Sequence, residues 1–181
     1  MIYGNIALEK LIKEERIKPS DGLKINPASV NLCLGNTFLI PKPDQIITLG
    51  QKVEYTEIYT EDGGGFIIQP GQFVLATTKE WISVPENGAA FVQGRSSIGR
   101  SGLTVQNAGF VDPGFHGHIT LELRNDMPCP IILIPGYPVT QLVYMDVKDI
   151  DKVYEGKYNN QVKATGSRMY MDEFNAKEKT E

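Results

Sequence analysis

The chain has 181 residues, with 22 acidic and 18 basic side chains and a formal net charge of −4. This length suits a single domain over residues 1–181 with an apolar core that needs no disulfides. The sequence contains no Lys- and Arg-rich run, so we expect no nucleic-acid partner. It has no apolar run near the ~20 residues of a membrane helix and no signal-like N-terminus, so we expect a soluble, cytoplasmic protein with no membrane partner.

Two cysteines, Cys33 and Cys129, lie far apart in the chain, and neither belongs to a CxxC pair. Cysteines in this arrangement are usually free thiols in a reducing compartment. We therefore expect two buried or half-buried thiols.

The first predicted element is a helix over residues 5–17, where apolar side chains recur at helical spacing. Asn5 is the expected N-cap, and Pro19 with the Asp21-Gly22 pair is expected to end the helix. The apolar side chains of this segment are Ile6, Leu8, Leu11, Ile12 and Ile17.

Beyond this helix, apolar and polar side chains alternate, and Gly, Pro, Asn or Asp interrupts the pattern at short intervals. Many short alternating segments predict an all-β barrel or sandwich. The predicted strands span 30–40, 45–49, 53–59, 65–69, 73–78, 89–93, 103–111, 117–124, 130–134 and 139–147. Residues 148–181 are polar and charged and are expected to form an arm or lid, with the last ~7 residues disordered.

Residues 94–103, GRSSIGRSGL, combine two arginines with small residues. Small residues allow a backbone to approach phosphate oxygens, and guanidinium groups bind those oxygens in paired geometry. The segment therefore predicts an anion site. The alternative is a polar hairpin with two solvated arginines.

Residues 117–124, GHITLELR, alternate as a strand with Glu122 in its polar face. A carboxylate held in the middle of a strand suits a general acid or base. The alternative is a solvated sheet face with an ion pair, such as one between Glu122 and Arg124. The pattern puts Ile119, Leu121 and Leu123 on one face and His118, Thr120, Glu122 and Arg124 on the other.

Asp112 stands before a Pro113-Gly114 turn. Aspartates at such positions are usually turn formers, and the alternative is a carboxylate directed into a pocket.

Further along, the tail residues Tyr154, Lys157 and Gln161 offer donors of the kind that a lid over a charged ligand needs. A solvated tail is the alternative.

The two histidines, His116 and His118, complete no set of metal ligands. Zinc nucleobase deaminases carry an H-x-E…P-C-x-x-C pattern, which is absent, so we expect no zinc and no metal-ligating residues. A G-x-S-x-G elbow is also absent, which argues against a serine hydrolase.

Four segments together resemble the dCTP deaminase branch of the trimeric dUTPase superfamily. They are PASVNLCLG at 27–35, GRSSIGR at 94–100, AGFVDPGFHGHITLEL at 108–123 and GKYNNQVKATGSR at 156–168. The resemblance implies a distorted β-barrel of the dUTPase-like, β-clip type. It also implies a homotrimer with active sites shared between subunits and a C-terminal arm that closes over the nucleotide.

The resemblance implies that Glu122 is the catalytic residue that moves a proton from an attacking water to the cytosine ring and the leaving ammonia. It implies that Ser96 and Arg100 position that water and the pyrimidine. Asp112 matches an aspartate that contacts the deoxyribose and, in dUTPases, orients the water that attacks the α-phosphate.

The resemblance also implies three groups of substrate-binding residues: a cradle for the phosphates, residues beside the base, and residues of the arm. The matched residues are Arg95, Ser97, Ile98 and Gly99 in the cradle, Thr120 and Leu121 beside the base, Gln141 at the phosphates, and Tyr154, Lys157 and Gln161 in the arm. Mg²⁺ would bind through the nucleotide phosphates, as that ion usually does.

Two departures from the family pattern stand out. Members usually read SVDLRLG where this chain has Asn31 and Cys33. Because an acid and a base are lost together, the change removes an ion pair rather than leaving one charge unpaired. At Gly109, deaminase-only members tend to carry bulkier residues, whereas Ala-Gly-aromatic resembles the bifunctional members.

The leading hypothesis is a zinc-independent, Mg²⁺-dependent dCTP deaminase that also cleaves dUTP, giving dUMP and diphosphate for dTTP synthesis. Its expected ligands are dCTP and dUTP, with dTTP as a candidate feedback ligand. One alternative is a dUTPase alone, which would retain Asp112 without needing Glu122. The other is a non-catalytic nucleotide-sensing protein on the same scaffold.

Overall fold

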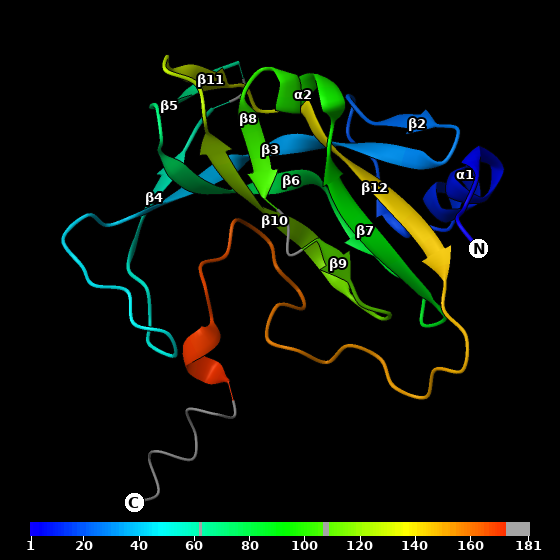
Figure 1. Ribbon diagram of the computed structural model, residues 1–181. Helices are drawn as coiled ribbons and strands as arrows, with labels where there is room; N and C mark the ends of the chain where they lie inside the picture. Colours follow the sequence, from blue (N-terminus) through cyan, green and yellow to red (C-terminus); the bar gives the residue numbers. More distant parts are fainter. Residues whose placement is uncertain (62, 107–108, 173–181) are drawn as a thin grey trace, which may run out of the picture.

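The computed structural model describes residues 1–61, 63–106 and 109–172 (Figure 1). The elements follow one another as α1 (Asn5–Lys13), β1 (Ile17–Lys18), β2 (Lys24–Asn26), β3 (Ser29–Pro41), β4 (Tyr55–Tyr59), β5 (Phe66–Ile68), β6 (Phe73–Ser83), β7 (Gly88–Gly94), α2 (Ser96–Arg100), β8 (Leu103–Gln106), β9 (Phe110–Val111), β10 (His116–Asn125), β11 (Ile131–Leu133), β12 (Pro138–Asp146) and the short helix η1 (Met169–Met171).

Within the described residues, ten strands form one antiparallel sheet, and its main order is β8-β10-β6-β3-β12-β7-β9. β1 lies beside β6, while β2 and β4 lie beside β3. β5 and β11 pair as a separate ribbon. The large sheet curls round on itself (Figure 1). The expected all-β fold with a distorted, barrel-like sheet is therefore confirmed.

β3 is the central strand, and its residues from Ser29 to Gly35 are all buried. Large side chains that are fully withdrawn from water, such as Leu32, Phe38 and Tyr144, form the core around it. The rings of Phe38 and Phe66 stack with centroids 4.7 Å apart. Burial of each large apolar side chain stabilises the fold by about 1.5–3 kcal/mol, which fixes the strands that carry the site.

The predicted helix is correct in kind but too long. α1 buries Leu8 and Leu11 and ends at Lys13, because Glu15 takes a left-handed conformation with φ of 56°. Ile17 then joins β1 opposite Ile82 of β6 and is fully buried there. The N-cap prediction is wrong, because Gly4 occupies that position and its lack of a side chain leaves no side-chain cap.

Two strand predictions are wrong. Residues 45–49 form a loop, closed at its base by hydrogen bonds from the Gln45 amide to backbone oxygens of Lys42 and Glu54. Residues 103–111 do not form one strand: β8 ends at Gln106, and a second strand, β9, begins at Phe110. The short strands β1 and β2 carry too few residues to show a period, and the sequence did not predict them.

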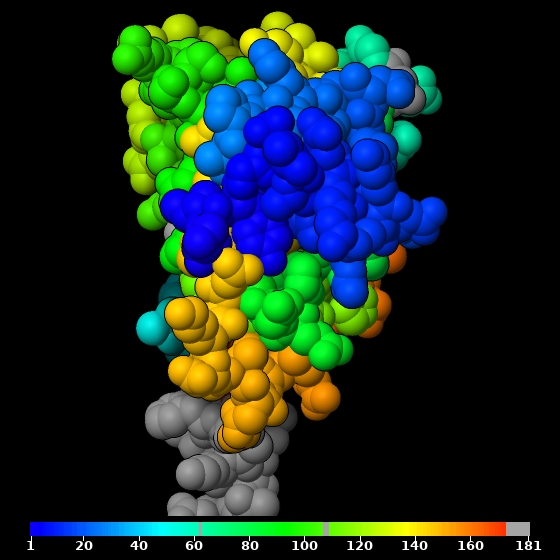
Figure 2. All heavy atoms as spheres, turned by 90° about the vertical axis from the view of Figure 1, so that its right-hand side faces the viewer, coloured from blue at the N-terminus to red at the C-terminus, as the bar shows by residue number. Residues whose placement is uncertain are grey.

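The N-terminal residues extend the edge of β12. The Tyr3 N–H donates to the Tyr144 carbonyl at 2.9 Å, and the N-terminal amine of Met1 lies 3.1 Å from a carboxylate oxygen of Asp146. In Figure 2 the dark blue N-terminal atoms border the golden atoms at the end of β12 and beyond it. These contacts join the N-terminus to the end of β12, directly before the tail begins.

Residues 148–172 form an extended tail that runs back across the molecule (Figure 1). Gln161 and Ala164 are buried, so the alternative of a solvated tail is wrong for this stretch. The predicted disorder of the last ~7 residues lies outside the described residues. Among the described residues, no helix has the length and apolar character to cross a membrane.

Cys33 and Cys129 are both free thiols. Cys33 is buried, as expected, whereas the expectation for Cys129 is wrong because its side chain is exposed. Burial raises the pKa of the Cys33 thiol to about 11, and a thiol with a raised pKa is unreactive.

Candidate active site

A cavity of about 510 Å³ lies between the tail and one face of the sheet. β6, β8, β9 and β10 supply its walls, and residues of the tail close another side. The lining includes the polar side chains of Gln106, Asp112, Thr120, Glu122, Tyr154 and Gln161. A volume in this range matches that of small-molecule sites.

Glu122 lies in β10 and lines this cavity. The predicted alternation is confirmed: Ile119, Leu121 and Leu123 are buried, whereas Glu122 is half-buried. Desolvation by burial raises the pKa of its carboxyl group. The predicted alternative of an ion pair with Arg124 is wrong, because Arg124 Nε lies 3.0 Å from Asp126 instead.

Asp112 combines the two roles that the sequence left open. Its backbone oxygen accepts a hydrogen bond from the Phe115 N–H at 3.2 Å, and Gly114, with φ of 81°, completes the turn. Its exposed carboxylate lines the cavity with Gly109 and Glu122. The turn therefore holds an exposed carboxylate beside the strand that carries Glu122.

The tail attaches to β10 through Gln161. The Gln161 carbonyl accepts from the His118 N–H at 2.8 Å, and its side-chain oxygen accepts from Thr120 Oγ1 at 2.8 Å. At Gly117 the backbone has φ of 142°, and an added Cβ would lie 2.8 Å from the Gln161 nitrogen. Glycine at this position therefore allows the tail to approach the strand closely.

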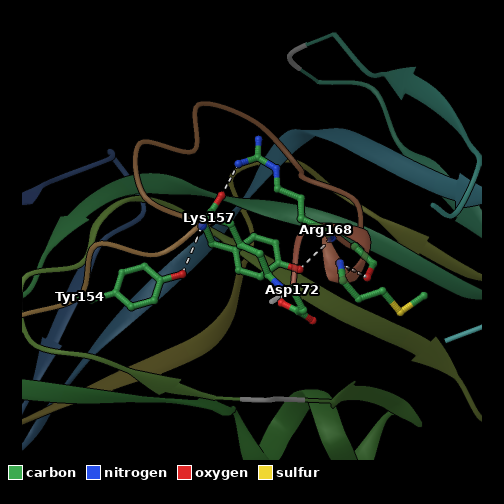
Figure 3. A network of polar contacts seen from close by, with 7 residues as sticks. Tyr154, Lys157, Arg168 and Asp172 are labelled. Carbon is green, nitrogen blue, oxygen red and sulfur yellow. Dashed lines mark hydrogen bonds and ion pairs between the residues drawn. The ribbon is translucent and has the colours of Figure 1, made fainter. Parts of the chain in front are cut away.

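A second set of contacts folds the tail onto itself (Figure 3). The ammonium of Lys157 pairs with Asp172, and the guanidinium of Arg168 donates to the Lys157 carbonyl. The hydroxyl of Tyr154 accepts from the Tyr158 N–H at 3.2 Å. Tyr154 lines the cavity, whereas Lys157 does not. In this conformation the cation is therefore held by an internal carboxylate.

The segment 94–103 lies apart from the cavity. Residues 96–100 form α2 and not a hairpin, with Ile98 buried against the sheet. α2 lies at the top of Figure 1, and the tail runs along the bottom. Arg95 donates to the Pro138 carbonyl at 2.7 Å. The predicted residues Arg95, Ser96, Ser97, Ile98, Gly99 and Arg100 are absent from the cavity lining.

Two further predicted residues also lie outside the cavity lining. Gln141 is half-buried in β12, opposite Gln93 and Asn31. The Leu121 side chain points into the core on the opposite face of β10, so only its backbone remains available to a ligand.

The positions of Asn31 and Cys33 are core positions of β3. Asn31 Oδ1 accepts from Asn26 Nδ2 at 2.8 Å. The Cys33 N–H donates to the buried carboxylate of Glu80 at 2.8 Å. An added Cβ at Gly22 would lie 2.7 Å from the Cys33 sulfur. The smaller side chain at position 33 therefore packs closely against Gly22.

Within the described ranges, no group of three His, Cys, Asp or Glu side chains gathers as a metal site. The Nδ1 atoms of His116 and His118 each lie 3.1 Å from a backbone carbonyl oxygen, those of Gly114 and Thr78 respectively. Both imidazoles are thus tied to the backbone near β10.

The sequence did not predict some of the lining residues, namely Gln106, Tyr55, Tyr158 and Ser167. Gln106 ends β8, and its position opposite Glu122 depends on strand register. Tyr55 and Ser167 meet through the Ser167 N–H, which donates to the tyrosine hydroxyl at 3.3 Å. Such long-range pairings leave no local signal in the sequence.

The fold is similar to those of two enzymes of known structure. The deoxycytidine triphosphate deaminase of Agrobacterium tumefaciens superposes with a TM-score of 0.64 at 19% identity, over 79% of this chain and 47% of that one. A point mutant of the dUTPase of Staphylococcus bacteriophage 80alpha gives 0.51 at 15% identity, over 78% of this chain and 96% of that one. The fold is thus the one shared by these deaminases and dUTPases.

Sequence comparison gives the family itself. The dCTP deaminase-like family model matches residues 2–147, and the chain belongs to this family. It is 46% identical to the "dCTP deaminase, dUMP-forming" of Sulfurihydrogenibium sp. (strain YO3AOP1), over 95% of this chain and 99% of that one. It is 43% identical to the protein of the same name from Persephonella marina, with the same coverage.

Proposed function

We propose that this chain deaminates dCTP and cleaves the product, giving dUMP, ammonia and diphosphate. The observation that carries the proposal is the half-buried carboxylate of Glu122 on a rigid strand, facing a cavity of nucleotide size. The relatives named "dCTP deaminase, dUMP-forming", which match over nearly their whole length, support it. Residues 1–181 act as one domain, with 148–181 as its arm.

In the deamination step, Glu122 is the proton carrier. It takes a proton from the water that attacks C4 of cytosine and gives it to ring N3. A second proton then leaves with the amino group as ammonia, and a carbonyl remains at C4. Desolvation raises the pKa of the Glu122 carboxyl, which brings this group closer to the pH at which it both accepts and donates protons.

In the cleavage step, Asp112 orients a second water in line with the α-phosphate. Asp112 and Gly109 line the same cavity as Glu122, and the absence of a side chain at Gly109 leaves room beside the carboxylate. One cavity then serves both reactions, so dUTP formed by deamination is cleaved before release.

The residues of α2 complete the site from another subunit of a homotrimer. Ser96 and Arg100 are exposed and lie outside the cavity lining, and Gln141 lies on the strand beside them. In the trimer, Ser96 and Arg100 position the water and the pyrimidine. Arg95 and Ser97, with the backbone at Ile98 and Gly99, hold phosphates.

Mg²⁺ fits this site as an ion carried by the nucleotide. It prefers oxygen ligands, keeps several waters and binds through substrate phosphates, and the exposed carboxylate of Asp112 at the cavity is compatible with a cation carried there. When bound, the ion would neutralise phosphate charge.

The arm residues Tyr154, Lys157 and Gln161 close over the triphosphate. As a feedback ligand, dTTP binds in the same place.

Glu122→Gln tests the deamination step. Glutamine keeps the size but carries no exchangeable acid proton, so ammonia release from dCTP should fall by at least ~10²–10⁴-fold, with dCTP binding nearly unchanged by calorimetry. Ammonia release within tenfold of wild type would refute the assignment.

A further inference from the structure

Gln106 stands directly opposite Glu122. Antiparallel pairing of β8 with β10 puts these two residues in register. Residues paired in this way point to the same face of a sheet, with Cβ atoms about 4.5–5.5 Å apart. Both side chains line the cavity, so the amide of Gln106 lies within reach of the carboxylate.

The other neighbours of Glu122 are either apolar or already bonded to other residues. On the opposite side, β6 puts Leu75 in register with it. Along β10, the Thr120 hydroxyl donates to Gln161 and accepts from the Thr165 N–H at 3.0 Å. Arg124 pairs with Asp126 at 3.0 Å. Within the described part of the chain, neither Glu122 nor Gln106 has a side-chain hydrogen bond.

We propose that Gln106 is a positioning residue whose side-chain amide donates a hydrogen bond to the Glu122 carboxylate, in the nucleotide-free protein as well as during the reaction. The role in turnover rests on the proposed deamination, whereas the contact itself does not. The amide fixes the direction of the carboxylate toward the cytosine ring. It also donates a hydrogen bond to the carboxylate, which the apolar side chain of Leu75 on the other side of Glu122 cannot do.

This contact sets the protonation of Glu122. A donor to a carboxylate favours its ionised form, whereas desolvation favours the protonated form. The other titratable groups that line the cavity are Asp112, Tyr55, Tyr154 and Tyr158, and none of them is a cation. Loss of the Gln106 amide therefore leaves desolvation unopposed by any side chain of this wall and raises the pKa of Glu122.

Gln106→Met tests the contact, because methionine keeps the length of the side chain and lacks a donor. Thr104→Val is the matched control: it lies two residues earlier in β8, opposite Arg124, and outside the cavity lining. The first readout is a carbon NMR titration of the Glu122 carboxyl in nucleotide-free protein, which requires no catalysis.

The pKa of Glu122 should rise by about one unit in Gln106→Met. It should rise further in Gln106→Glu, because a second carboxylate then stands opposite Glu122. In Thr104→Val it should stay unchanged. In dCTP turnover, Gln106→Met should lower kcat about tenfold, shift the acid limb of the pH profile upward by a similar step, and leave KM within about twofold. An unchanged pKa of Glu122 in Gln106→Met, or a change in KM alone, would overturn the proposal. If the wild-type protein released no ammonia from dCTP but the pKa of Glu122 shifted as expected in the variants, the proposed function would be wrong and the contact between Gln106 and Glu122 would still be supported.

Discussion

The desolvation of Glu122, which suits its proposed role in catalysis, has a cost in stability. Its carboxyl is half-buried at the cavity and makes no side-chain hydrogen bond among the described residues, and desolvation by burial raises its pKa. A raised pKa means that the folded state favours the protonated form. A group of this kind is a candidate for catalysis because a structural carboxylate would be paired.

The pH dependence of stability checks this reading of Glu122. With a folded-state pKa above the unfolded value of about 4.3, the stabilising contribution of the protonated form is complete below that value and is lost as pH rises through the folded-state pKa. We therefore expect Glu122→Gln to melt at a higher temperature than wild type at pH 7, with the gap closing near pH 4. A gap independent of pH would contradict the assigned desolvation.

Asp112 is proposed to act only in the cleavage step, so its replacement should separate the two reactions. Asp112→Asn keeps a polar side chain at the turn but cannot take a proton from the water aimed at the α-phosphate. We expect dCTP to yield mainly dUTP in this variant, with ammonia release reduced far less than dUMP formation. Chromatography of the products measures both, and Asp126→Asn, on the exposed end of the sheet, is the control. Unchanged dUMP formation would exclude Asp112 from the cleavage step.

At the level of elements, β10 was predictable from the sequence, whereas the packing of the tail against β10 was not. The alternation in residues 117–124 follows from a strand with one buried face, so a period of two placed Glu122 correctly. The burial of Gln161 depends on pairing with Gly117, a contact between distant parts of the chain. The segment 45–49 looked like a strand by composition, yet Ile46 is 92% exposed, because no strand among the described residues pairs with this segment.

Gly117→Ala tests the attachment of the tail. Alanine disfavours φ of 142°, and its Cβ would press against the Gln161 nitrogen. We expect the tail to detach, with faster proteolysis after Val153 and KM for dCTP raised about tenfold. Gly4→Ala is the control, since its Cβ would make an ordinary 3.6 Å contact. Equal protection of the tail and equal KM in both variants would refute the lid.

Replacement of Asp172 tests the role of its ion pair with Lys157. This pair (Figure 3) binds the ammonium group that is proposed to contact the triphosphate. In Asp172→Asn the ammonium is free, so KM for dCTP should fall severalfold, with kcat little changed. A KM equal to or above that of wild type would show that this pair does not compete with the nucleotide.

For the whole molecule, the proposed site joins the cavity of one subunit to α2 of another. A mixture of inactive Glu122→Gln and Arg100→Ala subunits tests this directly. If each site takes Glu122 from one subunit and α2 from the next, random assembly in equal amounts gives about a quarter intact sites. We expect about a quarter of wild-type ammonia release after mixing under exchange conditions. Persistent inactivity would place both groups in one subunit's site.

The central claim is that one cavity carries out both reactions. The most direct test follows wild-type protein with dCTP and Mg²⁺ by phosphorus NMR while ammonia is measured in parallel. We expect equal amounts of ammonia, dUMP and diphosphate, with little free dUTP at any time. Stoichiometric accumulation of dUTP would contradict the coupled reaction, and absence of ammonia would contradict the deaminase itself.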